Sequence, residues 1–355
     1  MITVEKQQFL NAIKAVKTSC SKNKINPILE GINLTTVGQG LQLTATDCTN
    51  SARTIIEANV KEPMDVCINA EKLENIVNAL DDIITIDCPD TTATFKSGKT
   101  HFNIVVMQAS DFPETNFVLE GQKVLLAKDD FIKGINKTII ATATETQSLL
   151  NGICFTFNEN GYEMAATDGN RLSQVKYDNV ETSLKEGQYV IPHNVLSSAI
   201  RCINDNVELY FQANRVILKA GNYLYSSSLL NGTFPKYQQL IPQNQQYKAA
   251  IDRAELLKSL EKVAIMSDSR TNITVFDFKN GELHLTTSCE GGRAEDAIEV
   301  SFDEELKIAF NFRFVLEGIK MMQSEVVEFG MSSATGACLI KGDFYYLVMP
   351  IMQKG

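Results

Sequence analysis

The sequence lacks the residues and motifs on which most enzymes depend. It has only three histidines, His101, His193 and His284, and none stands in an H-E-x-x-H pattern or at a metal-binding distance from cysteine or carboxylate. The G-x-S-x-G nucleophile motif, the G-x-x-x-x-G-K-[ST] phosphate loop and the G-x-G-x-x-G dinucleotide fingerprint are all absent. We therefore expect no catalysis, no metal and no other cofactor.

Long apolar runs and paired cysteines are missing as well. No run approaches the roughly 18 residues that a membrane-spanning helix needs, and the first ten residues lack the basic region and apolar core of a secretory signal. The eight cysteines form no C-x-x-C pair, and most lie in apolar or strand-like runs. We interpret them as reduced core thiols of a cytoplasmic protein that has no membrane partner.

What the sequence does contain is one segment that recurs. The stretch 161–177, GYEMAATDGNRLSQVKY, is echoed at 40–56 and more faintly at 281–298, so that Leu41, Tyr162 and Leu283 are each 121 residues apart. A solenoid repeat is only about 20–50 residues long, whereas a domain has roughly 100–200. The period therefore predicts three domains of one fold, at residues 1–121, 122–245 and 246–355.

Each domain combines helices with alternating strands, which predicts an α+β fold. Phe9, Leu10, Ile13 and Val16 lie on one face of a helix predicted over residues 5–18. Alternation of apolar and polar residues predicts half-buried strands, as at 32–35 and 41–44. Further helices are predicted at 71–80, 129–140, 193–203, 253–264 and 312–320, and further strands at 83–86, 101–105, 150–155 and 345–351.

Charge is distributed unevenly between these elements. Counted over residues 5–18, 71–80, 128–140, 193–203, 253–264 and 312–320, the predicted helices carry a formal charge of +5, whereas the whole chain carries −10, which leaves −15 for the rest of the chain. A net charge of −10 by itself argues against a nucleic-acid partner. Lysine and arginine are good helix formers, so exposed helix faces explain the basic residues equally well. The alternative is an assembly whose helices face a polyanion while its outer sheet stays acidic.

The tip of the recurring segment differs between the domains. Asp168-Gly169 is a strong hairpin signal, because glycine takes positive φ without steric cost. The tip Asp168–Arg171 corresponds to DCTN at 47–50 and to CEGG at 289–292. A plain turn would explain the aspartates of the first two tips better than any metal site, but it gives no reason for Gly169 and Arg171. We therefore predict a binding site in the second domain alone.

A second unusual segment is the C-terminal run Leu347–Ile351, which is too apolar for a free tail. Because Pro350 cannot donate to a sheet ladder, the run could be an edge strand that ends the fold. It could also be an exposed apolar lip beside Arg171 and Pro242, suited to a groove that takes a short peptide.

These residues resemble the bacterial beta sliding clamps, the processivity subunits of DNA polymerase III. The matching pieces follow in order along the whole chain: PILEG at 27–31, ATDGNRL at 166–172, GTFPKY at 232–237 with Pro242, FN at 310–311 and VMPI at 348–351. The resemblance implies an α+β fold of three repeated clamp-type domains, with inner helices and an outer antiparallel sheet. It also implies a head-to-tail dimeric ring around double-stranded DNA, bound without sequence preference, and an alternative is a peptide-binding scaffold that does not encircle DNA.

The resemblance further implies three sets of functional residues. A groove for peptides of the Gln-x-x-Leu-Phe type, carried by the replicative polymerase, the clamp loader and repair proteins, would be formed by Leu150, Thr167, Gly169, Arg171, Leu172, Pro242, Asn311, Phe314, Met349, Pro350 and Ile351. The residues expected to face DNA are Lys22, Lys24, Gln147, Lys137, Arg201 and Lys258. The residues expected at the dimer interface are Phe102 and Ile104 of one copy with Ile265 and Met266 of the next.

The sequence departs from the family pattern at two places. Asn170 stands where some relatives have histidine, and the chain ends in Met352-Gln-Lys-Gly355 where many relatives have an arginine-containing end. Both differences concern the rim of the expected groove. For the four interface residues, packing within the core of each domain is the alternative interpretation.

Overall fold

The computed structural model describes residues 1–23, 25–144, 148–178, 181–182, 184, 186–268, 270–302 and 304–352. The chain divides into two compact units, each of which is described by itself. The first unit comprises Met1–Ile132, Val180–Lys185 and Ile191–Leu230, and the second comprises Lys133–Asn179, Glu186–Val190 and Asn231–Gly355.

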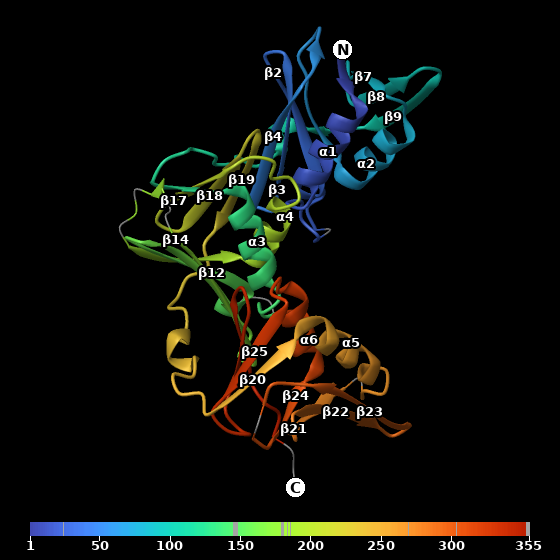
Figure 1. Cartoon of the computed structure of the whole chain (residues 1–355). Coiled ribbons are helices and arrows are strands. Elements are labelled where there is room, and N and C mark those ends of the chain that lie inside the picture. The colour runs from blue at the N-terminus through green and yellow to red at the C-terminus, as the bar shows by residue number, and fades with distance from the viewer. Residues whose placement is uncertain are drawn as a thin grey trace. The chain divides into compact units, whose positions relative to one another are not determined.

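The first unit is built from two antiparallel sheets (Figure 1). The smaller sheet has the order β5 (Asn59–Val60), β1 (Ile2–Glu5), β7 (Ile83–Asp87), β8 (Thr92–Ser97) and β9 (Thr100–Val105). The larger has the order β10 (Met107–Gln108), β6 (Asp65–Asn69), β2 (Gly31–Val37), β3 (Gly40–Thr46), β4 (Asn50–Glu57), β19 (Tyr223–Ser228), β18 (Arg215–Ala220), β17 (Val207–Phe211), β11 (Gln122–Leu126) and β15 (Glu181–Thr182). The larger sheet thus joins strands from the first and second predicted domains.

Three helices belong to the first unit: α1 (Lys6–Lys17), α2 (Ala70–Ala79) and α4 (His193–Ala199). The carboxylate of Glu5 caps α1 by accepting hydrogen bonds from the N–H groups of Gln7 and Gln8. Its apolar face, which includes Phe9 and Ile13, is buried against β3, β4 and α2. This confirms the amphipathic helix that the sequence predicts, with Lys14 exposed and Lys17 paired with Glu74 of α2.

The second unit also contains two antiparallel sheets. One has the order β16 (Gly187–Pro192), β12 (Gly152–Asn158), β13 (Gly161–Thr167), β14 (Arg171–Asp178), β27 (Tyr345–Val348), β26 (Cys338–Lys341), β25 (Val326–Met331) and β20 (Tyr247–Asp252). The other has the order β23 (Gly292–Glu299), β22 (Glu282–Cys289), β21 (Ile273–Lys279) and β24 (Leu306–Asn311). Helix α5 (Arg253–Ala264) packs on β22 and β23, and α6 (Phe312–Met321) packs on α5, β24 and β27 (Figure 1). Residues of α3 (Lys128–Ile139) fall in both units.

Helix α6 lies unusually close to β27, and this closeness positions the site described below. The side-chain oxygen of Asn311 caps the helix by accepting from the N–H of Arg313. A Cβ at Gly318 would lie 2.3 Å from the ring of Tyr346, so only glycine lets the helix approach the strand. Phe314 and Glu317, three residues apart, therefore lie on one side of α6 beside Tyr346.

The period of 121 residues is visible in the strand pairing. Leu41, Tyr162 and Leu283 are each the second residue of a strand that starts a hairpin, namely β3, β13 and β22. In the first unit β4 pairs with β19 so that Asn50 lies opposite Ser227, and in the second unit β14 pairs with β27 so that Arg171 lies opposite Val348. These two pairs are related by the same shift of 121, which confirms the repeat as a structural one.

Several local predictions need correction. Strand β27 is not an edge strand, because it pairs with both β14 and β26, and it ends at Val348 before the proline. Leu150 lies in a short 3₁₀ turn (Leu149–Asn151) rather than in β12, and α4 ends at Ala199 rather than Ile203. The cysteines are all free thiols, as predicted, but only Cys67, Cys154 and Cys338 are buried.

The described part of the chain contains no helix that is long and apolar enough to cross a membrane. It also contains no cluster of three or more histidine, cysteine or carboxylate side chains arranged to hold a metal ion.

Candidate partner-binding site

The predicted site begins at the turn between β13 and β14. The carboxylate oxygen Oδ1 of Asp168 accepts hydrogen bonds from the N–H groups of Asn170 (2.9 Å) and Arg171 (3.0 Å). The hydroxyl of Thr167 donates to the carbonyl of Arg171 and accepts from the N–H of Gly169, which has φ of +89°. This confirms the hairpin and the role of Asp168 as a turn residue. It also fixes the direction in which Arg171 leaves the turn.

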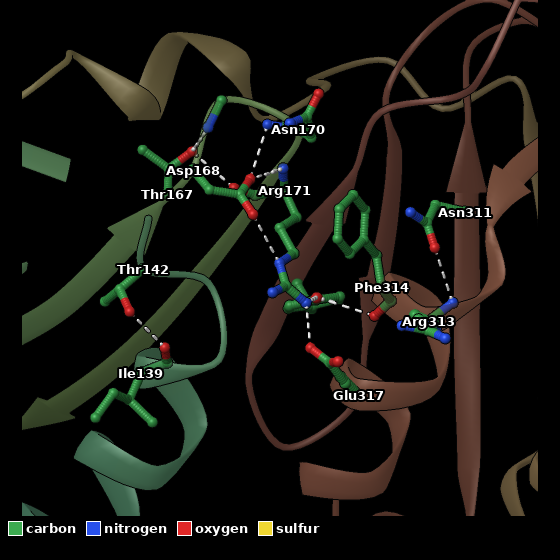
Figure 2. A network of polar contacts seen from close by, with 12 residues as sticks. Ile139, Thr142, Thr167, Asp168, Asn170, Arg171, Asn311, Arg313, Phe314 and Glu317 are labelled. Atoms are coloured by element: carbon green, nitrogen blue, oxygen red, sulfur yellow. Dashed lines mark hydrogen bonds and ion pairs between the residues drawn. The ribbon is translucent and has the colours of Figure 1, made fainter. Parts of the chain in front are cut away.

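Arg171 reaches from this turn toward the C-terminal half of the unit (Figure 2). Its Nε donates to Oδ2 of Asp168 at 3.0 Å, and its Nη1 donates to the carboxylate of Glu317 and, at 3.4 Å, to the hydroxyl of Tyr346. The guanidinium carbon lies 4.3 Å from the centre of the Phe314 ring, which is a cation–π distance. The guanidinium is therefore held on three sides by residues of three different elements.

The electrostatics keep Arg171 charged although its side chain is largely buried. Burial by itself lowers the pKa of an arginine, but the Tyr346 and Glu317 side chains outweigh that effect and raise the pKa of Arg171. Burial raises the pKa of Tyr346, so this hydroxyl stays neutral and able to donate. It donates to the carbonyl of Phe314 at 2.9 Å, which ties β27 to α6.

The C-terminal segment is held to this cluster by its backbone. The N–H of Met349 donates to the carbonyl of Asn170 at 2.8 Å, and the N–H of Ile351 donates to the carbonyl of Ala309 at 2.7 Å. Pro350, which has no N–H, lies between these two bonds. The segment thus links the hairpin tip to β24, and the Met349 side chain remains exposed. Of the two interpretations of this run, the lip beside Arg171 agrees with this arrangement.

The structure thus brings eight of the eleven predicted groove residues into one neighbourhood through contacts or strand pairing. They are Thr167, Gly169, Arg171, Leu172, Phe314, Met349, Pro350 and Ile351. Asn311 belongs beside them because it caps α6. Among the described residues, no hydrogen bond or strand pairing joins Leu150 or Pro242 to this neighbourhood, and their part in a groove stays a prediction.

The two other hairpin tips differ from the second tip at the position of Arg171. Asp47 caps its turn as Asp168 does, by accepting from the N–H groups of Thr49 and Asn50. At the place of Arg171, however, Asn50 is short and bonds back to Asp47 and to Ser227. The third tip pairs Cys289 directly with Gly292 and forms a tighter turn. Of the three described tips, only the second therefore carries an arginine whose side chain contacts α6.

Sequence analysis did not identify Glu317 and Tyr346 as site residues. Their signal was weak: Glu317 follows Phe314 by three positions on a predicted helix, and Tyr346 sits in an apolar strand. The hydrogen bonds that connect both to Arg171 span 146 and 175 residues of sequence, which no local pattern encodes.

The residues predicted to face DNA have different surroundings. Lys22, Arg201 and Lys258 are exposed, whereas Lys24 and Gln147 lie outside the described residues. Lys137 is only 9% exposed, and its ammonium group forms an ion pair of 2.6 Å with Asp343. The charge of Lys137 is thus paired inside the unit, and its contact with DNA stays a prediction.

The first unit also contains a cavity lined by basic residues that the sequence did not predict. A cavity of about 690 Å³ is lined by Arg201 of the predicted set together with Lys14 and Lys17 of α1. Lys17 forms an ion pair with Glu74, whereas Lys14 forms no ion pair with any residue that the structure describes. The sequence signal was available in the basic last turn of α1.

The predicted interface residues lie at or near open sheet edges. Phe102 and Ile104 lie on β9, an edge strand, where they line a cavity of about 490 Å³. Ile265 caps the end of α5 and is 82% exposed, which contradicts core packing for this residue. Met266 lies against the start of β23, the edge strand of its sheet, because its terminal carbon is 2.8 Å from a Cβ built on Gly292.

Three models of one protein family match the chain in succession. Residues 1–116 match the N-terminal domain of the DNA polymerase III beta subunit, residues 125–236 its central domain and residues 238–352 its C-terminal domain. The chain belongs to this family. Its three beta-clamp domains combine helices with antiparallel sheets, which confirms the predicted fold class, whereas the exact boundaries at 121 and 245 stay predictions.

Individual relatives agree with the family match. The chain is 29% identical to the beta sliding clamp of Synechococcus elongatus over 374 residues, with 100% of both chains covered. The crystal structure of a sliding clamp from Bartonella birtlesii bound to griselimycin matches with a TM-score of 0.94 at 26% identity and 99% coverage of each chain. The clamp of Bacillus subtilis, at 22% identity, shares the fold with a TM-score of 0.92 over 99% of each chain. The function is therefore that of a DNA sliding clamp, and the family is one of non-enzymatic processivity factors.

Proposed function

We propose that two copies of this chain close head to tail into a ring around duplex DNA in the cytoplasm, and that the site around Arg171 tethers replication proteins to that ring. The observation that carries the proposal is the succession of three clamp-domain matches over residues 1–352. DNA, DNA polymerase III and a second copy are the general partners of this family. The clamp loader and repair proteins are proposed as further partners of the same site.

The open sheet edges support a ring. Strand β9 lies at an edge of its sheet in the first unit, and the side chain of its last residue, Val105, is exposed. Strand β23 lies at an edge of its sheet in the second unit. Edge strands pair readily with a second chain. Phe102 and Ile104 beside one edge and Ile265 and Met266 beside the other would supply the apolar contacts of a head-to-tail interface.

The distribution of basic residues supports weak, sequence-independent contact with DNA. Lys22, Arg201 and Lys258 are exposed, and Lys14 lines the same cavity as Arg201. Lysine and arginine bind phosphates without reading base sequence. A few such contacts on an otherwise acidic protein suit sliding better than tight binding.

The Arg171 cluster supports a peptide site. It combines a held cation, the exposed Met349, the Phe314 ring and the two backbone anchors of the C-terminal segment. Apolar anchors with a few fixed polar groups are the usual composition of a site for a short linear segment. A peptide of the Gln-x-x-Leu-Phe type would fit this composition.

The ring is tested by retention on DNA. Protein is loaded by the clamp loader on nicked circular DNA, the circle is linearised, and the ends are either left free or blocked by bound protein. We expect retention on the blocked DNA and rapid loss from the free-ended DNA, because a ring leaves only by sliding off. Equal loss from both would contradict encirclement and favour a scaffold that binds peptides without enclosing DNA.

A further inference from the structure

Three of the five N–H donors of Arg171 are in use within the unit. Nε is bound to Asp168, and Nη1 is bound to Glu317 and Tyr346. Among the described residues the other terminal nitrogen, Nη2, has no partner. Since the guanidinium stacks on Phe314 through one face, a ligand in this site would meet Arg171 through Nη2 and its two N–H groups.

The charge around these free donors is not positive. Arg171 contributes one formal positive charge, and Asp168 and Glu317 contribute one negative charge each through ion pairs with it. The cluster therefore carries one net negative charge although its ligand-facing group is an arginine. A bare arginine would attract a carboxylate, but this cluster would repel one and still donate to a neutral carbonyl or amide oxygen.

The two carboxylates do not contribute in the same way. Both carboxylate oxygens of Asp168 are already hydrogen-bonded, because together they accept two bonds from N–H groups of the turn and one from Nε of Arg171. Glu317 is 47% exposed and, within the described part of the chain, is bound only to Arg171, so its charge remains open to a ligand. Figure 2 shows Glu317 on α6 opposite the hairpin, with its carboxylate turned toward the Arg171 guanidinium.

We propose that Glu317 is a specificity-determining residue, which makes the Arg171 site accept uncharged hydrogen-bond acceptors and reject carboxylates. This inference rests on the proposed peptide site and names the chemistry of its ligands. Partner segments should therefore present an amide or a backbone carbonyl to Arg171, and an acidic side chain or a free C-terminal carboxylate in that position should weaken binding. Glu317 acts here by its charge, in addition to holding the guanidinium in place.

The variant E317Q separates charge from positioning. Glutamine has nearly the same shape and can still accept the hydrogen bond from Nη1, so the guanidinium stays in place while the negative charge is lost. The probes are acetyl-Gln-Ser-Ala-Leu-Phe-amide, the same peptide with glutamate in the first position, and the same peptide with a free C-terminal carboxylate. Affinities are measured by calorimetry or fluorescence anisotropy on the full chain at low salt, where electrostatic selection is strongest.

For the unchanged protein we expect the neutral peptide to bind about tenfold more tightly than at least one of the two anionic peptides. In E317Q this ratio should fall to about twofold or less, with the affinity for the neutral peptide little changed. The control is E261Q, which removes a glutamate of α5 that pairs with Lys320 of α6 and forms no ion pair with Arg171. This control should keep the tenfold ratio.

The outcomes separate the inference from the proposed function. An unchanged ratio in E317Q, or no discrimination by the unchanged protein, would overturn the role of Glu317 while leaving the peptide site intact. Failure of the unchanged protein to bind even the neutral peptide would overturn the peptide site itself, and the inference with it. The ring is judged separately, by retention on DNA.

Discussion

Lys137 and Asp343 illustrate what one buried ion pair does in this chain. The ammonium group of Lys137 lies 2.6 Å from Oδ2 of Asp343 and 5.5 Å from the centre of the Phe344 ring. The other carboxylate oxygen accepts from the N–H of Gln323. The pair thus ties α3 to the turn between β26 and β27, next to the strand that carries Tyr346. Its role is to hold the second and third domains together at this junction.

Asp343 predicts a dependence of stability on pH. Burial raises its pKa, but Lys137 and the N–H of Gln323 outweigh burial, so its folded pKa lies below the usual 3.8. A carboxylate with a lowered pKa stabilises the fold above pH 3.8 and loses that contribution as the pH falls through its folded value. At pH 7, D343N should therefore reduce the free energy of unfolding by about 1–3 kcal/mol.

The measurement is urea unfolding of both proteins between pH 7 and pH 3, and the difference between them should shrink at the acid end. The variant D81N, which changes an exposed aspartate in the first unit, should cost less than about 0.5 kcal/mol at any of these pH values. A difference for D343N that stays constant down to pH 3 would contradict the assigned role of the carboxylate.

Among elements, the hairpins demonstrate that similar turns can have different consequences. The tips at Asp47 and Asp168 use the same capping bonds, since both aspartates accept from the N–H groups two and three residues later. Sequence comparison predicts this turn in both, because the Thr-Asp pair recurs. The residue three positions after the aspartate determines what the turn contacts. Asn50 forms hydrogen bonds with the nearby Asp47 and with Ser227, whereas Arg171 forms hydrogen bonds with residues of α6 and β27.

The C-terminal segment is the element that completes the site. We expect that removal of residues 349–355 together with R171A weakens binding of acetyl-Gln-Ser-Ala-Leu-Phe-amide by at least about a hundredfold, because one apolar anchor and the held cation are both lost. The midpoint of thermal unfolding should fall, because the bonds from Met349 and Ile351 and those of Arg171 to Asp168, Glu317 and Tyr346 are all removed, but the protein should stay folded at the temperature of the binding measurement. Anisotropy gives the affinity and calorimetry the unfolding midpoint. The matched control is R215A, which removes an arginine of the first unit and should bind the peptide normally.

At the scale of the whole molecule, the open edges of the sheets are the features that bear on assembly with a second copy. Both β9 and β23 end their sheets, and the side chains beside them include the highly exposed Ile265 and Val105. A single chain gains nothing from exposing such apolar groups, whereas an interface would bury them. The proposed ring therefore accounts for edges and exposed apolar residues together.

This account predicts that I265D turns the dimer into a monomer. A carboxylate at the centre of an apolar interface must lose its hydration without gaining a partner, which should weaken dimerisation by about a hundredfold or more. Sedimentation velocity at micromolar concentration measures the change. The control is I25D, because Ile25 is equally exposed at 84% but is not one of the predicted interface residues. Monomers in both variants, or a dimer in I265D, would contradict the assigned interface.

The sequence by itself determined the features that short-range chemistry controls. Periodicity located the six α-helices of the described residues to within a few positions, the Thr-Asp pair located the turns, and the period of 121 revealed three copies of one fold. The contrast between the three tips also pointed to Arg171, because a residue that the fold does not require stands out against its own repeats.

Only the tertiary structure decided what those residues contact. Strand β27 became an interior strand because β14, more than 160 residues earlier, pairs with it. The charge of Lys137 is paired because Asp343 lies beside it, and Glu317 contacts Arg171 because Gly318 lets α6 approach β27. Each of these outcomes depends on pairing between distant segments, which local propensity and spacing do not encode.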